Sequence, residues 1–164
     1  MKCIILSDSH GSPERIASIL KKHPTAEVIF FLGDGLSDLS YLRIPETAAL
    51  LAVRGNCDFT ATLPSGESAP RLGSITLSGH KILYTHGDLY GVKYHDGGLL
   101  RLAEEHGAEI VLFGHTHAKK ERYVPTENGG VYLFNPGAVS SYEGSYGILM
   151  LDEKNVLFSH GTLL

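Results

Sequence analysis

Five short apolar runs along the chain end in the same way, and this shared ending is the feature that most limits the fold. Each run is followed by Asp, Asn or His, and glycine stands beside most of these residues. A short apolar run bounded by turn residues is typical of a buried strand. The runs and their endings are 3–6 with Ser7-Asp8-Ser9-His10, 28–32 with Gly33-Asp34, 50–53 with Arg54-Gly55-Asn56, 82–85 with His86-Gly87-Asp88, and 110–113 with Gly114-His115-Thr116-His117.

Helices are expected between these strands. Apolar residues recur at helical spacing after Pro13, which fits a first helical position, and Ser12 is placed to cap that helix. Gly107 is placed to end the last helix, and Asp96 is expected to cap it rather than to line a pocket with His95. The expected helices are 13–22, 36–42 and 99–106.

Strands and helices alternate in the first third of the chain, which favours parallel strands. The rest predicts antiparallel strands: 75–77 and 81–84 form a hairpin around Ser78-Gly79-His80, and three more come after it. Those three are 131–134, 146–151 and 156–158. Two mixed sheets with helices outside would bury all these runs, and a length of 164 residues fits one domain over 1–164.

Composition excludes some classes of protein. A net charge of −4 and a pI of about 6.1 argue against a general nucleic-acid-binding surface, so nucleic acid is expected only as a substrate. Neither of the two cysteines, Cys3 and Cys57, lies in a C-x-x-C motif, which favours reduced thiols and a cytoplasmic protein. No apolar segment is long enough to span a membrane.

The polar endings carry the chemistry, because ligands bind beyond the carboxyl ends of strands in open α/β sheets. Carboxylate and amide oxygens with imidazole nitrogens suit Mn, Fe, Ni, Co or Zn more than a soft-metal site. Seven such groups are too many for one tetrahedral ion and suit two ions about 3.5–4 Å apart. The candidate metal ligands are Asp8, His10, Asp34, Asn56, His86, His115 and His117.

Each ending taken alone has an ordinary structural explanation. Asp8 could cap the next helix, and a Gly-Asp or Gly-Asn pair is more often a turn. His115 and His117 could be surface histidines, although side chains two apart on an extended chain point the same way and would face one site, each taking a different ion. The five endings together favour a metal site.

In this order the endings resemble the signature of the calcineurin-like metallophosphoesterase superfamily, D-x-H…G-D…G-N-x-[DE]…H…G-H-x-H. Asn135-Pro136-Gly137 also resembles a loop of its compact bacterial and archaeal members. The resemblance covers most of the chain. It implies a four-layer αββα sandwich of two mixed β-sheets flanked by helices, with a two-metal site at the edge where the sheets meet.

The resemblance also implies roles for the ligands. One ion would take Asp8, His10, Asp34 and His117, and the other Asp34, Asn56, His86 and His115, with Asp34 bridging. Asp34, Asn56 and His86 are then the expected catalytic residues. The cofactors would be two divalent ions (Mn favoured over Ni, Co, Fe or Zn). The implied reaction is attack on a phosphate diester by a hydroxide that bridges the two ions.

The chain departs from the family pattern at Cys57. Many members have a histidine there, the usual candidate for protonating the leaving group, and a thiol with a pKa of about 8.5 is a less natural acid. Small prokaryotic phosphodiesterases of the family look similar, so we expect a phosphodiesterase that is weak on monoesters with poor leaving groups. Arg54 is expected to contact a substrate phosphate or a surface carboxylate, and Asp58 to orient a ligand.

The rival hypothesis is a scaffold or binding module on the same fold that acts through protein partners. The retromer coat subunit of the family keeps the sandwich but lacks part of the ligand set, whereas the set is complete here. Completeness favours the enzyme. The resemblance further implies a homodimer or homotetramer, and the short chain implies an open site for small phosphodiesters.

Overall fold

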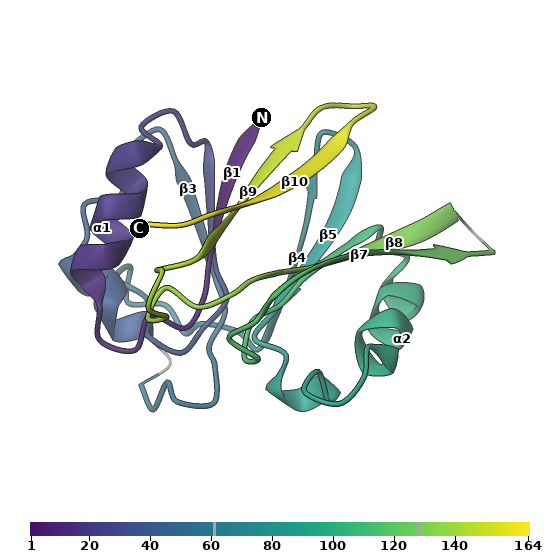
Figure 1. The fold of residues 1–164 in the computed structure, drawn as a ribbon, viewed down its shortest axis with the longest axis horizontal. Helices are drawn as coiled ribbons and strands as arrows, with labels where there is room; N and C mark the ends of the chain where they lie inside the picture. The colour runs from purple at the N-terminus through teal and green to yellow at the C-terminus, as the bar shows by residue number, and fades with distance from the viewer. Residues whose placement is uncertain (61, 128) are drawn as a thin grey trace.

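Two five-stranded sheets lie face to face in this computed structural model, which describes residues 1–60, 62–127 and 129–164. Helix α1 (Pro13–Lys22) covers the outer side of one sheet and α2 (Gly97–His106) covers the outer side of the other (Figure 1). The layers are therefore helix, sheet, sheet, helix. This confirms the expected αββα sandwich.

The first sheet aligns three of the polar endings. Its order is β10 (Val156–Gly161), β9 (Tyr146–Leu151), β1 (Lys2–Leu6), β2 (Val28–Phe31) and β3 (Ala49–Ala52). β1, β2 and β3 are parallel, and their last paired residues, Leu6, Phe31 and Ala52, stand side by side. The endings of these three strands consequently leave the sheet at one edge.

The second sheet is mixed in the same way. Its order is β4 (Leu72–Leu77), β5 (His80–Thr85), β6 (Ile110–Leu112), β8 (Gly129–Pro136) and β7 (Lys119–Thr126). β4 and β5 form the expected hairpin, while β5, β6 and β8 are parallel. Strand β7 was not predicted, because it is a mostly exposed edge strand of charged and polar residues that pairs with β8 through its backbone.

The helices match the sequence-based expectation closely. α1 has the predicted bounds, although Ser12 at its N-cap position makes no side-chain cap hydrogen bond. The predicted 36–42 helix is the 3₁₀ helix η1 (Leu36–Tyr41), and a short η2 (Asp88–Tyr90) precedes α2. Gly107 ends α2 in the left-handed conformation, as expected. Among the described residues, none of these helices has the length and apolar character that a membrane crossing requires.

The predicted cap of α2 is wrong. Asp96 occupies the N-cap position, but its side chain makes no cap hydrogen bond. Its carboxylate instead accepts hydrogen bonds from Lys120 Nζ (2.5 Å) and Arg122 (2.7 Å) on β7. Two cations from a neighbouring strand compete successfully with the helix N–H groups, because charge-assisted hydrogen bonds are the stronger kind.

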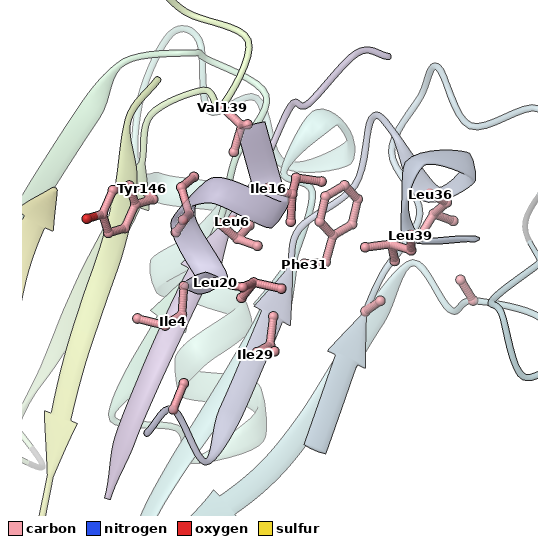
Figure 2. Close-up of a cluster of buried hydrophobic side chains, with 14 residues drawn as sticks. Ile4, Leu6, Ile16, Leu20, Ile29, Phe31, Leu36, Leu39, Val139 and Tyr146 are labelled. Atoms are coloured by element: carbon pink, nitrogen blue, oxygen red, sulfur yellow. The ribbon is translucent and has the colours of Figure 1, made fainter. Parts of the chain in front are cut away.

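Three apolar clusters hold the four layers together. In the outer cluster, Ile16 and Leu20 of α1 pack on Ile4 and Phe31 of the first sheet, with Leu36 of η1 beside them (Figure 2). A second cluster lies between the sheets, and a third lies between α2 and the second sheet. Burying one large aliphatic or aromatic side chain contributes about 1.5–3 kcal/mol, so the three clusters stabilise the layers that carry the loops at the sheet edge.

Candidate metal centre

The candidate ligands meet where the carboxyl ends of the two sheets come together. Backbone hydrogen bonds tie the endings to one another: Asp8 N–H donates to Gly33 (2.9 Å), His10 N–H to Asp34 (3.1 Å) and Gly114 N–H to His86 (2.9 Å). The third of these bonds joins neighbouring endings in the second sheet. The structure thus brings together all seven predicted ligands: Asp8, His10, Asp34, Asn56, His86, His115 and His117.

The first cluster of donor atoms consists of Asp8, His10 and His117, whose ligand atoms all lie within 4.8 Å of one another. His117 Nε2 lies 3.1 Å from Asp8 Oδ1 and 3.3 Å from His10 Nε2. Two imidazole nitrogens and a carboxylate oxygen therefore face a common point, an arrangement suited to one divalent cation.

The second cluster consists of Asp34, His86 and His115. His86 Nε2 lies 3.3 Å from Asp34 Oδ2, 3.2 Å from His115 Nδ1 and 3.1 Å from Asn56 Oδ1. Asp34 Oδ2 is also 4.0 Å from His10 Nε2 of the first cluster. Asp34 stands between the two clusters, so the grouping agrees with the one implied by the resemblance, and the metal-ligand roles themselves stay predictions.

Within the described part of the chain, one buried carboxylate oxygen in the first cluster lacks a hydrogen-bond donor. Asp8 Oδ1 is fully buried and accepts no hydrogen bond among the described residues. Leaving a buried polar atom without a partner costs about 1–3 kcal/mol, and more for a charged group. The other oxygen of this carboxylate accepts from Ser7 Oγ (2.5 Å) and His115 N–H (3.1 Å). The residues present fit a divalent ion whose bond to Oδ1 would remove the penalty.

The electrostatics suit metal binding at Asp34 and His115, whereas at His86 a metal ion would have to displace a proton. Burial opposes ionisation of Asp34, but hydrogen bonds from His86 and from the Cys57 N–H (2.7 Å) outweigh it and lower the pKa of the carboxyl well below its usual range. Burial, with the neighbouring His86, lowers the pKa of His115. Burial also opposes charge on His86, yet Asp34 and Asp8 raise its pKa. An ionised Asp34 and a neutral His115 are the forms that bind metals.

Most of the candidate ligands lie on strained backbone. Five of the seven have positive φ: Asp8 (56°), His10 (44°), Asp34 (58°), His115 (67°) and His117 (58°). This region is uncommon for residues with a Cβ and clusters at functional sites. The assumption that His115 and His117 lie on extended chain is therefore wrong. Left-handed turns, not strand pleat, direct one ring into each cluster.

Asp58 supports the ligand Asp34 through its backbone. Its carboxylate accepts four N–H groups at 2.8 Å: those of Asp34 and Gly55 on Oδ2, and those of Gly35 and Leu36 on Oδ1. The backbone at Gly55 packs closely against Asp34, and glycine is required there because a Cβ would overlap the Asp34 carboxylate. The arrangement is consistent with the predicted orienting role of Asp58.

Sequence reasoning missed a second supporting carboxylate, Asp38. This buried residue of η1 accepts Ser9 Oγ (2.6 Å), Gly11 N–H (3.0 Å) and Ser12 N–H (3.2 Å), and so holds the loop that carries His10. No local motif marks it. Ser9 and Asp38 are 29 residues apart, and only the fold brings them together.

The two other predicted site residues differ in placement. Cys57 is exposed beside Asp34, and partial desolvation together with that carboxylate raises the pKa of its thiol. Arg54 is half-buried, its N–H donates to Pro70, and no ion pair to it is found within 1–60, 62–127 and 129–164. The expected contact with a surface carboxylate is therefore not found among these residues, and the expected contact with a substrate phosphate stays a prediction.

Comparison with known proteins decides the family. The calcineurin-like phosphoesterase superfamily domain matches residues 1–161. The chain belongs to this superfamily. It is similar to the probable metallophosphoesterase YsnB of Bacillus subtilis, at 35% identity over 93% of this chain and 85% of YsnB. It is also similar to the phosphodiesterase YfcE of Escherichia coli K12, at 28% identity over 96% of this chain and 91% of YfcE.

A solved structure extends the likeness in fold. Vps29 of Entamoeba histolytica, determined in complex with Zn²⁺, superimposes with a TM-score of 0.76 over all of this chain and 93% of Vps29, at 16% identity. That identity shows the shared fold alone. Membership of the calcineurin-like superfamily confirms the resemblance found in the sequence and supports metal binding and phosphoesterase chemistry in general terms.

Proposed function

We propose that this protein is a metal-dependent phosphodiesterase for small phosphate diesters with good leaving groups. The observation that carries the proposal is the complete set of seven donor side chains, divided into two clusters with Asp34 between them. The relative named a phosphodiesterase, YfcE, supports the choice of diesters.

When bound, two divalent ions would supply a nucleophile from water and neutralise charge developing on the phosphoryl oxygens. Asp8, His10 and His117 would hold one ion, Asn56, His86 and His115 the other, and Asp34 would contact both. Imidazole and oxygen donors suit Mn²⁺, our first choice, as well as Ni²⁺, Co²⁺, Fe²⁺ or Zn²⁺.

The rest of the site bears on the leaving group. No histidine follows Asn56, and the exposed Cys57, whose pKa is raised by partial desolvation and by Asp34, stands in its place. A thiol of raised pKa is a weak acid for an alkoxide. Aryl diesters need little protonation of their leaving group, whereas alkyl monoesters need more, so diesters are the favoured substrates.

The test is hydrolysis of bis-p-nitrophenyl phosphate. Protein stripped with a chelator receives Mn²⁺, Ni²⁺, Co²⁺, Zn²⁺ or Mg²⁺ in turn. We expect the metal ions to restore activity in the wild type. In Asp34→Asn and His86→Ala we expect activity at least about a hundredfold lower, because loss of a residue that only supports a ligand costs about 10–100-fold. His106→Ala, a histidine at the end of α2, is the matched control and should keep full activity.

The alternative is a scaffold on the same fold that acts through protein partners. Two ions bound per chain without hydrolysis of any ester would favour it. Faster turnover of an alkyl monoester than of the aryl diester would instead keep the esterase and reject the diester preference.

A further inference from the structure

A third group of donor atoms overlaps the two clusters of the metal centre. His10, Asp34 and Cys57 bring a nitrogen, an oxygen and a sulfur within 4.8 Å of one another. His10 comes from the first cluster and Asp34 from the second, whereas Cys57 belongs to neither. The group therefore adds a soft donor to a centre otherwise made of nitrogen and oxygen.

Hydrogen bonds hold the Cys57 segment against this centre. The Cys57 N–H donates to Asp34 Oδ1 (2.7 Å), and Asn56 Nδ2 lies 3.3 Å from Cys57 Sγ. Asp58 Oδ2 receives the N–H groups of both Gly55 and Asp34, so one carboxylate ties the two segments together. This network fixes the backbone that carries the sulfur beside Asp34, and the Asn56 amide contacts the sulfur itself.

The unpartnered oxygen of the first cluster lies beside His10, the residue that this group shares with that cluster. The buried Asp8 Oδ1 accepts no hydrogen bond from any described residue and lies 3.1 Å from His117 Nε2 and 3.8 Å from His10 Nε2. A cation held by His10 would therefore also lie near this carboxylate oxygen. Such an oxygen is costly when buried alone, which favours occupation of this side of the centre.

We propose that Cys57 is a ligand for a thiophilic divalent ion, such as Zn²⁺, Cd²⁺ or Co²⁺, held together with His10 and Asp34. This rests on the metal centre of the proposed function and adds a sulfur donor to it. Thiolate shifts the preference of a nitrogen and oxygen site toward softer metals. The thiol loses its proton to solvent as the sulfur–metal bond forms, and Cys57 then has no proton to give a leaving group.

The experiment is a Cd²⁺ titration of the chelator-stripped full chain, monitored by the ultraviolet sulfur-to-cadmium charge-transfer band, with bound Cd²⁺ counted separately. Cys3 is the other cysteine of the chain and is fully buried in β1, so a band that rises with bound Cd²⁺ reports on Cys57. We expect Cys57→Ser to abolish the band and to weaken Cd²⁺ binding at least about tenfold, while Mn²⁺ binding stays unchanged. Cys3→Ala should keep the band.

Two outcomes would overturn the proposal: stoichiometric Cd²⁺ without the band, or equal Cd²⁺ affinity in the wild type and Cys57→Ser. Failure here is distinct from failure of the proposed function. Mn²⁺-dependent hydrolysis without the band rejects only the thiol ligand, whereas a band in a protein that hydrolyses nothing rejects only the esterase.

Discussion

At the residue scale, the candidate ligands are aimed by turns that residues with a Cβ seldom adopt. His117 is the position at which the backbone strain can be measured with little loss of packing, because its φ is 58° and its side chain is 49% exposed. In the metal-free protein we expect His117→Gly to have a free energy of unfolding about 1 kcal/mol above that of His117→Ala, since glycine enters the left-handed region without strain. Urea denaturation measures the difference.

The matched control is Ser18, an exposed residue in the middle of α1. There the order should reverse, with Ser18→Gly about 1 kcal/mol less stable than Ser18→Ala, because glycine is unfavourable inside a helix. Equal stability of the two His117 variants would mean that the turn stores no strain.

A second prediction concerns Asp58, whose two oxygens each accept two N–H groups. In Asp58→Asn one oxygen becomes an NH₂ group that faces two N–H donors. We expect a loss of about 2–3 kcal/mol of stability and of about 10–100-fold in metal affinity, measured by denaturation and calorimetric titration. Asp152→Asn removes a carboxylate that accepts two backbone N–H groups and the Asn155 amide in an exposed turn, and it should leave metal affinity intact.

At the element scale, Asp96 fastens α2 to the edge strand β7 through Lys120 and Arg122. Asp96→Asn should lower the free energy of unfolding by about 1–3 kcal/mol at neutral pH, toward the low end because both cations are partly exposed. Burial opposes ionisation of Asp96, but the two cations lower its pKa below the unfolded value of about 3.9.

The stabilisation is therefore fully present above the unfolded pKa and is lost as pH falls through the lower folded pKa. The stability gap between wild type and Asp96→Asn should stay constant at neutral pH and close below about pH 4. Urea denaturation at a series of pH values tests this, and a gap that persists in acid would show that packing, not charge, accounts for the loss.

At the scale of the whole molecule, the candidate metal centre spans the edge between the two sheets. Asp8, His10 and Asp34 come after strands of the first sheet, and His86 and His115 come after strands of the second. An ion that binds only the folded arrangement stabilises it by about 2.7 kcal/mol at one hundred times its Kd. For a chain of this size we expect Mn²⁺ to raise Tm by roughly 5–10 °C.

Calorimetry with Mn²⁺ and then with excess chelator measures the shift and its reversal. Asp34→Asn, which loses the carboxylate between the clusters, should show a much smaller shift. An unchanged Tm in wild type with stoichiometric Mn²⁺ bound would mean that the unfolded chain binds the ions as tightly as the folded arrangement does.

The sequence by itself determined the apolar strands, their polar endings and the family, because each of these depends on a short apolar run and the few residues directly after it. The family resemblance already implied how the donors divide between two clusters. Tertiary structure alone decided which turns aim them, and that the Cys57 sulfur reaches His10 and Asp34. It also decided the partners of Asp38 and Asp96, which lie 24–29 residues away along the chain. Strand β7 depends on backbone pairing with β8, which leaves no apolar pattern. Residues far apart in the chain come into contact only when the layers pack together.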